Sequence, residues 1–211
     1  MYYNIHTHQF SNNPEIVELV NQYPNEVNSD LPSFTVGIHP WYLNEEQLDE
    51  ELQLIEKYIE HPNCKAVGEC GLDKRIETTL EIQKKVLIPQ LILAEKYKKP
   101  VILHCVAAYQ EIIRIKKELK LTIPLIIHGF SKNAQVAKSL WSNGFYLSFG
   151  KYLLLNPELS NVLKTVPVEQ IFLETDTMEQ TIFDVYSKAE NILNRNVKDL
   201  ITENYNRVFN Q

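Results

Sequence analysis

Six side chains that can bind a divalent cation recur at or near the ends of short apolar segments of this chain. They are four imidazoles and two carboxylates: His6, His8, Glu69, His104, His128 and Asp176. This mixture of ligands suits Zn²⁺, Mn²⁺ or a similar divalent ion, Mg²⁺ included, better than an all-oxygen Ca²⁺ cage. Two such ions about 3.5–4 Å apart lower the pKa of a bridging water and clamp the oxygens of an in-line displacement. The residues therefore predict a two-metal hydrolase that attacks through a metal-bridging hydroxide.

The first two candidates form the motif His6-Thr7-His8. Side chains two residues apart on a strand point the same way, so both imidazoles can reach one ion. Alone, the motif leaves a metal-binding pair and a hydrogen-bonded pair equally open. Its position at the end of an N-terminal strand favours metal binding.

Glu69 lies in the segment AVGECGLD, residues 66–73. Glycines on either side of it allow backbone and ligand to approach closely. The alternative is a water-exposed glutamate that ends a strand. Asp73, in the same loop, is expected first of all to be an acceptor that stabilises the loop, and a second role in orienting a metal ligand stays open.

His104 and His128 each close an apolar run, and Asp176 follows the last one in the segment LETDT. A single histidine in such a place is more often a hydrogen-bonded core residue, but two of them beside the HxH motif favour metal binding. For Asp176 the alternative is the N-cap of a following helix, a role that aspartate often fills.

Short strand-like runs alternate with longer segments of helical periodicity. Continuous apolar runs are typical of strands buried on both faces of a parallel sheet, and strand–helix alternation implies right-handed βαβ units that close into a barrel. We therefore predict an α/β fold, a TIM-type (β/α) barrel forming a single domain over residues 1–211. Residues 15–20 fit either a short helix or an eighth strand, and only about 26 residues separate His8 from the strand that leads to His39, too few for a full helix–strand–helix passage. We therefore expect the second β/α unit of the barrel to be abbreviated. The predicted strands are 2–7, 34–39, 65–69, 100–104, 125–128, 145–149 and 170–174. The predicted helices are 45–60, 78–98, 108–120, 133–143, 156–165, 183–195 and 197–209.

The net charge of −6 disfavours a general nucleic-acid coat or an anionic membrane as partner. It leaves a phosphate substrate open, because bound cations reverse the local charge. The N-terminus resembles no signal peptide, no run is long enough to span a membrane, and the three cysteines lack CxxC spacing. We therefore expect a cytoplasmic protein with no obligate protein partner.

Read in order, the motifs are HTH at 6–8, GIHPW at 37–41, AVGECGLD at 66–73, PVILHC at 100–105, IIHGFS at 126–131 and LETD at 173–176. This succession resembles the TatD family of metal-dependent deoxyribonucleases, within the amidohydrolase-like barrels. The resemblance implies that one metal is held by His6, His8 and Asp176, and the other by His104 and His128. It further implies that Glu69 bridges the two metals, that Glu69 and Asp176 are catalytic, and that His39 lines the substrate site. From the residues alone, His39 is as readily a strand-end residue held extended by Pro40.

Three positions depart from the family pattern. Asn4 replaces the aspartate two residues before the first histidine, Val106 replaces an arginine two residues after His104, and Met178 follows Thr177 where a proline is usual. The metal ligands are thus complete while the substrate pocket differs. The first functional hypothesis is a phosphodiesterase or deoxyribonuclease acting on DNA or small nucleotides. The alternative is an amidohydrolase-type enzyme that cleaves a C–N or ester bond of a small metabolite. A degenerate binding module is the third and is disfavoured by the complete ligand set.

Overall fold

The computed structural model describes residues 1–210, which form two compact units. The first unit combines residues Met1–Val20 with the chain from Ile126 onward, and the second unit is Asn21–Leu125. Because the first unit is assembled from both ends of the chain, the second unit is an internal segment of the sequence. The prediction of a single domain over 1–211 stays a prediction.

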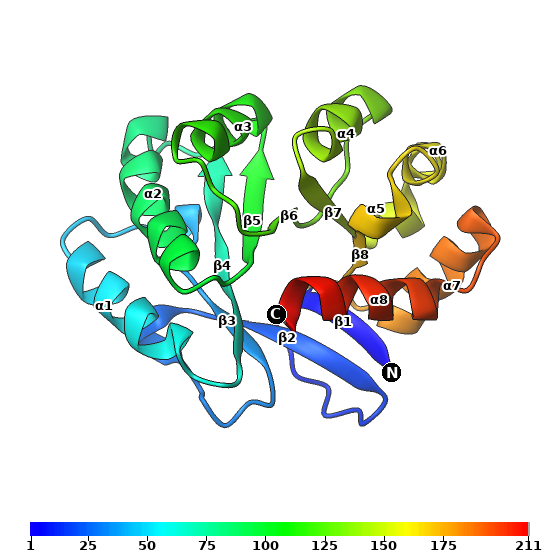
Figure 1. Ribbon diagram of the computed structural model, residues 1–211, viewed down its shortest axis with the longest axis horizontal. Helices are drawn as coiled ribbons and strands as arrows, with labels where there is room; N and C mark the ends of the chain where they lie inside the picture. Colours follow the sequence, from blue (N-terminus) through cyan, green and yellow to red (C-terminus); the bar gives the residue numbers. More distant parts are fainter. Residues whose placement is uncertain (211) are drawn as a thin grey trace. The chain divides into compact units, whose positions relative to one another are not determined.

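The strands of the first unit pair in parallel. β1 pairs with β2, and β7 pairs with β8, while a parallel bridge between Thr7 and Asp176 joins the segment after β8 to β1. Helices α7 and α8 pack against β1 and β8 (Figure 1). The strands are β1 (Tyr2–Thr7), the start of β2 (Ile16–Gln22), β6 (Leu125–Ile127), β7 (Phe145–Phe149) and β8 (Ile171–Leu173). The helices are α4 (Ala134–Trp141), α5 (Lys151–Leu155), α6 (Glu158–Leu163), the 3-10 turn η3 (Val168–Gln170), α7 (Ile182–Leu193) and α8 (Val197–Phe209).

The second unit is built around three consecutive parallel strands. β4 pairs with β3 on one side and with β5 on the other, and α1 and α2 pack against β4. The strands are β3 (Phe34–Val36), β4 (Cys64–Asp73) and β5 (Val101–Val106). The helices are α1 (Leu48–Ile59), α2 (Leu80–Lys96) and α3 (Tyr109–Glu118), with 3-10 turns η1 (Pro24–Glu26) and η2 (Pro40–Tyr42).

The prediction that the second β/α repeat of the barrel is abbreviated is confirmed. The ambiguous residues 15–20 lie largely in strand β2, no helix joins β1 to β2, and only η1 lies between β2 and β3. One boundary differs in a way that matters for the site. β4 was predicted to end at Glu69 but continues to Asp73, because Cys70–Asp73 pair with Leu103–Val106 of β5. Glu69 and His104 therefore lie inside their strands, where the backbone on both sides is held by the sheet.

Two buried glutamines of α2 hold the backbone around the strand ends. Gln90 accepts a hydrogen bond from the Ile38 amide at 2.8 Å and donates to its carbonyl at 3.3 Å. Gln83 does the same for Asp73, at 2.7 Å and 2.8 Å. Because a primary amide offers one acceptor and two donors, each side chain satisfies both backbone groups of one residue. These contacts fix the positions of Asp73 and of the residue before His39.

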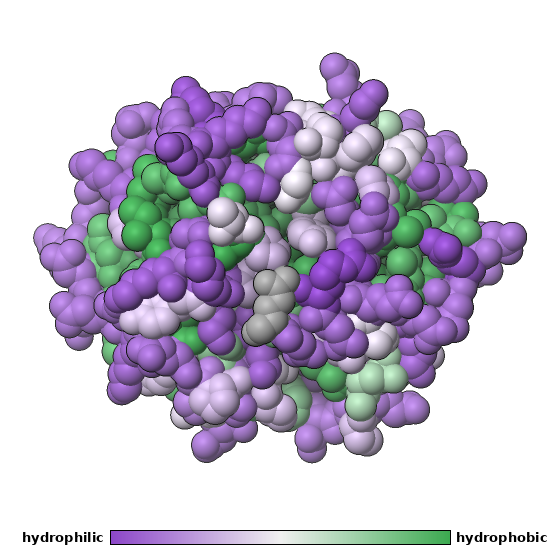
Figure 2. All heavy atoms as spheres, in the orientation of Figure 1, coloured by the Kyte–Doolittle hydropathy of each residue, from purple (hydrophilic) through white to green (hydrophobic). Residues whose placement is uncertain are grey.

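Polar and charged side chains cover much of the face seen in Figure 2, with hydrophobic residues between them in smaller groups. Across the described residues, no helix combines the length and apolarity that crossing a membrane requires. Among the described residues, the large hydrophobic side chains that are exposed are Met1, Phe10, Trp41, Tyr42, Ile92, Tyr152 and Leu155.

Glu95 at the end of α2 supports the second unit through a pH-dependent contact. Its carboxylate accepts hydrogen bonds from the Thr122 and Ile123 amides at 2.8 Å and 3.3 Å and from Lys98 at 2.7 Å. Burial opposes ionisation, but these bonds outweigh it and lower the pKa of Glu95 from 4.5 to about 2. Since the folded pKa is the lower one, the stabilisation is complete above about pH 4.5 and is lost as the pH falls toward 2.

We predict that Glu95→Gln lowers the free energy of unfolding by about 1–2 kcal/mol near neutral pH, because the amide keeps the shape but loses the charge-assisted bonds. Denaturant titrations between pH 7 and pH 3 measure the difference from the parent protein, which should shrink with acid. Glu118→Gln, on an exposed side chain, is the control and should change stability by less than about 0.5 kcal/mol. A difference for Glu95→Gln that stays constant with pH would contradict this account.

Candidate metal centre

The first unit brings His6, His8 and Asp176 together in what we term the aspartate cluster. The Oδ1 atom of Asp176 lies 3.6 Å from Nε2 of His6 and 3.5 Å from Nε2 of His8, and the three ligand atoms lie within 4.8 Å of one another. These separations are long for hydrogen bonds. They match the spacing of about 3.3–3.6 Å between two ligands that sit 2.0–2.2 Å from one tetrahedral ion. The donor set and its spacing therefore fit a divalent metal.

The backbone around Asp176 is held against the end of β1. The Asp176 amide donates to the His6 carbonyl at 2.9 Å, and the His8 amide donates to the Asp176 carbonyl at 3.2 Å. Asp176 itself has φ +53°, a left-handed conformation that aspartate tolerates better than most residues. The alternative role of helix N-cap is excluded, because Thr181 caps α7. A left-handed backbone conformation at a carboxylate residue beside two histidines is consistent with a functional site.

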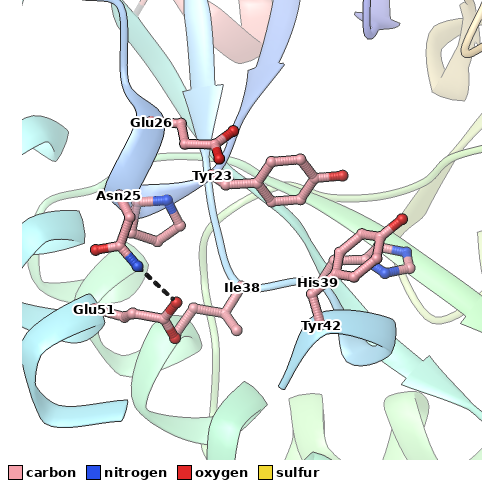
Figure 3. Close-up of a pocket in the computed structure, with 8 residues that line it drawn as sticks. Tyr23, Asn25, Glu26, Ile38, His39, Tyr42 and Glu51 are labelled. Atoms are coloured by element: carbon pink, nitrogen blue, oxygen red, sulfur yellow. Dashed lines mark hydrogen bonds between the residues drawn. The ribbon is translucent and has the colours of Figure 1, made fainter. Parts of the chain in front are cut away.

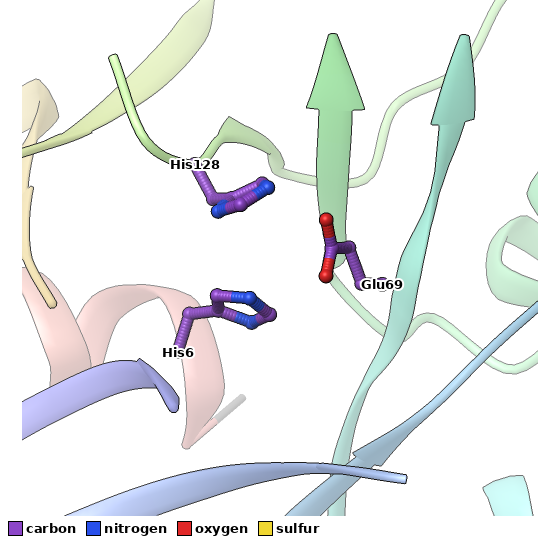
Figure 4. A group of neighbouring side chains, drawn as sticks. All are labelled: His6, Glu69 and His128. Carbon is purple, nitrogen blue, oxygen red and sulfur yellow. The ribbon is translucent and has the colours of Figure 1, made fainter. Parts of the chain in front are cut away.

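His128 lies next to this cluster within the first unit. Its ring centroid is 4.3 Å from that of His6, and the two imidazoles can be followed in Figure 4. Glu174 contacts Nδ1 of His128 at 3.4 Å and accepts a hydrogen bond from the Gly129 amide at 2.7 Å. A carboxylate behind an imidazole orients it and raises its basicity as a ligand. Sequence reasoning assigned Glu174 no role, although the LETD motif contains it.

The second unit brings His39, Glu69 and His104 together in what we term the glutamate cluster. Oε1 of Glu69 lies 3.1 Å from Nε2 of His39 and 2.9 Å from Nδ1 of His104. Glu69, which projects from β4 in Figure 4, is only 3% exposed, and its backbone amide donates to the Asn21 side chain. Burying an ionised carboxylate is costly without such partners. Its environment therefore fits a carboxylate held ready for a cation.

His39 contacts Glu69, but its hydrogen bonds argue against direct metal binding. The Trp41 backbone amide donates to Nδ1 of His39 at 3.1 Å, so the proton of the neutral ring lies on Nε2, the atom facing Glu69. A metal ligand at Nε2 would need that proton moved to Nδ1, where it would oppose the Trp41 amide. The geometry thus favours a hydrogen-bond donor at this position.

Asp73 supports His104 from the other side of the ring. Its Oδ2 atom lies 3.2 Å from Nε2 of His104 and accepts from the Trp41 indole at 2.8 Å, while Oδ1 accepts from the Arg75 amide. Burial raises the pKa of Asp73, but these bonds outweigh it and hold that pKa below its ordinary value. Both expected roles of Asp73, bracing the loop and supporting a ligand, are consistent with these contacts.

The glycines beside Glu69 are required by the close approach of neighbouring backbones. A Cβ atom at Gly71 would lie 1.8 Å from the His104 carbonyl oxygen, and one at Gly68 would lie 2.6 Å from that of Ile102. Both distances are far below van der Waals contact. Gly68 and Gly71 therefore permit the close approach of β4 to β5, the two strands that carry Glu69 and His104.

Solved structures of other proteins show the fold. A TatD homologue from Escherichia coli matches 95% of this chain and 79% of its own, with a TM-score of 0.73 and 21% identity. An uncharacterized amidohydrolase from Saccharomyces cerevisiae matches 99% of both chains, with a TM-score of 0.79 and 15% identity. The chain therefore has the predicted TIM-type barrel fold of the TatD and amidohydrolase proteins.

The sequence comparisons identify the family. The family model described as TatD related DNase matches residues 2–210, so this chain belongs to that family. It is 29% identical over 164 residues to the uncharacterized metal-dependent hydrolase YabD of Bacillus subtilis, covering 76% of this chain and 62% of YabD. It is 29% identical over 147 residues to the 3'-5' ssDNA/RNA exonuclease TatD of Escherichia fergusonii, covering 67% of this chain and 56% of that protein. The chain thus spans about three fifths of the length of these curated relatives.

The aspartate cluster makes a specific prediction for metal binding. We expect His8→Asn to weaken Zn²⁺ binding by at least about 100-fold, because the substitution removes an imidazole ligand. Competition with a chromogenic chelator measures the affinity. The control is His61→Asn, which changes the one histidine of the sequence outside both clusters and the His128 site. Equal affinities for the two variants would show that the cluster does not bind the ion.

Proposed function

We propose that this protein is a divalent-metal-dependent phosphodiesterase that acts on DNA or small nucleotides. The observation that carries the proposal is the spacing of His6, His8 and Asp176, which is too long for hydrogen bonding and suited to a shared ion. Membership of the TatD related DNase family supports the same reading. Because the chain spans only part of its relatives, its substrate is part of the proposal.

The six predicted ligands would serve one reaction centre with two ions, of Zn, Mn or Mg. His6, His8 and Asp176 would hold one ion, His104 and His128 the other, and Glu69 would use its two oxygens for both. Bound divalent ions would lower the pKa of water and neutralise the charge that develops on the phosphate. Asp176 would orient the attacking water and accept its proton, and Glu174 and Asp73 would keep their imidazoles in the binding orientation.

His39 would act on the substrate rather than on a metal. Its Nε2 proton points to Glu69 in the structure, and a phosphate oxygen at that position would receive the same hydrogen bond. Such a donor stabilises the transition state if it is closer to the oxygen there than in the ground state. We expect substitution of His39 to lower turnover without releasing metal.

The activity of a relative supports nucleic acid as the substrate class. The relative from Escherichia fergusonii is named as an exonuclease for single-stranded DNA and RNA. We also propose a cytoplasmic location, since Cys64, Cys70 and Cys105 are free thiols buried in the core. Burial raises the pKa of Cys64 to about 11, and that of Cys105 to about 12.

An amidohydrolase activity on a small metabolite is the alternative. It is favoured by Val106 at the position where the family pattern has an arginine, which removes an expected phosphate contact. The residues of both clusters would serve a carbonyl substrate equally well. Rates measured on a phosphodiester and on cyclic amides or lactones distinguish the two activities.

We predict that Glu69→Gln reduces metal-dependent hydrolysis of single-stranded DNA and of bis-p-nitrophenyl phosphate by at least about 1,000-fold. The amide cannot bind two cations with two anionic oxygens, although it keeps the shape of the side chain. Initial rates with added Mn²⁺ measure the loss, and Glu60→Gln, on an exposed residue, should keep the parent rate. Hydrolysis of cyclic amides or lactones with no phosphodiesterase activity would establish the alternative and contradict the proposal.

A further inference from the structure

A pocket in the second unit adjoins His39 and is used by no step proposed so far. It has a volume of about 320 Å³, at the lower end of the range of small-molecule sites, about 300–1,000 Å³. Its walls come from η1, η2, the start of α1 and the segment after β3, and Figure 3 shows their side chains. The lining residues are Tyr23, Pro24, Asn25, Glu26, Ile38, His39, Tyr42 and Glu51.

Glu51 provides a buried hydrogen-bond acceptor in this pocket. The residue is 8% exposed, and its Oε1 atom accepts from the Asn25 side chain at 3.2 Å, drawn as a dashed line in Figure 3. Its other oxygen, Oε2, is buried without a hydrogen-bond partner among the described residues. Leaving a buried acceptor unsatisfied costs free energy, and a ligand N–H group would restore the missing bond. Burial, followed by the charge of Glu50, raises the pKa of Glu51.

Aromatic rings and the imidazole of His39 line the other side of the pocket. The rings of Tyr23 and Tyr42 meet edge to face, with centroids 5.4 Å apart. The ring centroid of Tyr42 lies 5.5 Å from that of His39. Tyr42 is 59% exposed, so its face is available to a planar group. Aromatic faces of this kind stack on any of the nucleobases.

The charge of the pocket defines which part of a substrate it accepts. Glu26 and Glu51 both line it, and no lysine or arginine does, so a phosphate is repelled from its interior. His39 connects the pocket to the glutamate cluster, because its Nε2 atom is 3.1 Å from Glu69. An uncharged planar group can therefore enter the pocket, while its attached phosphate stays outside beside His39, at the cations that Glu69 would hold under the proposed function.

We propose that this pocket binds the base of the substrate nucleotide and prefers bases with an exocyclic amino group, which donates to Oε2 of Glu51. The inference rests on the proposed function for the identity of the substrate. Cytosine and adenine present an amino group beside a ring nitrogen. Thymine presents its single N–H between two carbonyl oxygens, which a carboxylate repels. The unpaired acceptor thus discriminates between bases that stack equally well.

Calorimetric titration of the Mn²⁺-supplemented protein with dCMP and dTMP tests the preference, because the phosphate contribution cancels in the ratio of affinities. We expect the parent protein to bind dCMP about tenfold more tightly than dTMP, the value of one charge-assisted hydrogen bond. In Glu51→Gln the amide oxygen accepts from Asn25, which places an NH₂ group where Oε2 was. The preference should then disappear or reverse in favour of dTMP. Glu50→Gln, one residue earlier on α1, is the matched control and should keep the parent ratio.

Two further outcomes distinguish the base-binding proposal from the proposed phosphodiesterase function. A dCMP preference that depends on Glu51, found in a protein that hydrolyses no phosphodiester, would support the pocket and refute the proposed function. Phosphodiester hydrolysis with equal binding of dCMP and dTMP, or with a dCMP preference retained in Glu51→Gln, would overturn the proposed base preference of the pocket. Should Glu51→Gln not fold, Tyr42→Ala changes an exposed ring and should weaken both nucleotides by a similar factor. Unchanged affinity in Tyr42→Ala would overturn the proposal as well.

Discussion

Burial of ionised side chains is the constraint on which the functional part of this structure depends, because a carboxylate removed from water needs donors or a cation around it. Glu69 meets this requirement with two imidazoles about 3 Å away. The backbone around the charged groups must also be held in place. Gln83 and Gln90 hydrogen-bond both backbone groups of Asp73 and of Ile38, respectively, so neutral amides hold the backbone next to the charged groups. Such contacts fix geometry without adding charge to the site.

The same logic explains a departure from the family pattern. The side chain of Asn4 donates to the Thr175 hydroxyl at 2.8 Å and accepts from the Thr175 amide at 3.0 Å, next to Asp176. An aspartate at this position could accept hydrogen bonds from the Thr175 amide and hydroxyl but could not donate one. Asn4 therefore hydrogen-bonds β1 to the segment that carries Asp176, and it adds no further negative charge beside the aspartate cluster. We find no contact of this kind for Val106.

The alternation of strands and helices and the abbreviated second β/α unit of the barrel could be predicted, because each depends on a local pattern, such as an apolar run or a segment too short for a helix. The candidate ligands were chosen on the same kind of local pattern, such as a histidine after an apolar run. What the sequence did not predict depends on partners distant in the chain. The extension of β4 to Asp73 requires β5, the tautomer of His39 follows from the Trp41 amide, and the burial of Glu51 requires η1. Glu174 stood in a recognised motif, yet only its contacts with His128 and Gly129 give it a role.

Anomalous X-ray diffraction at the zinc and manganese absorption edges, from crystals grown with each ion, tests the central claim most directly. The account predicts two peaks about 3.5–4 Å apart, one bonded to His6, His8 and Asp176 and the other to His104 and His128, with Glu69 bonded to both. The absence of anomalous density at these residues, or two ions that do not share Glu69, would contradict it.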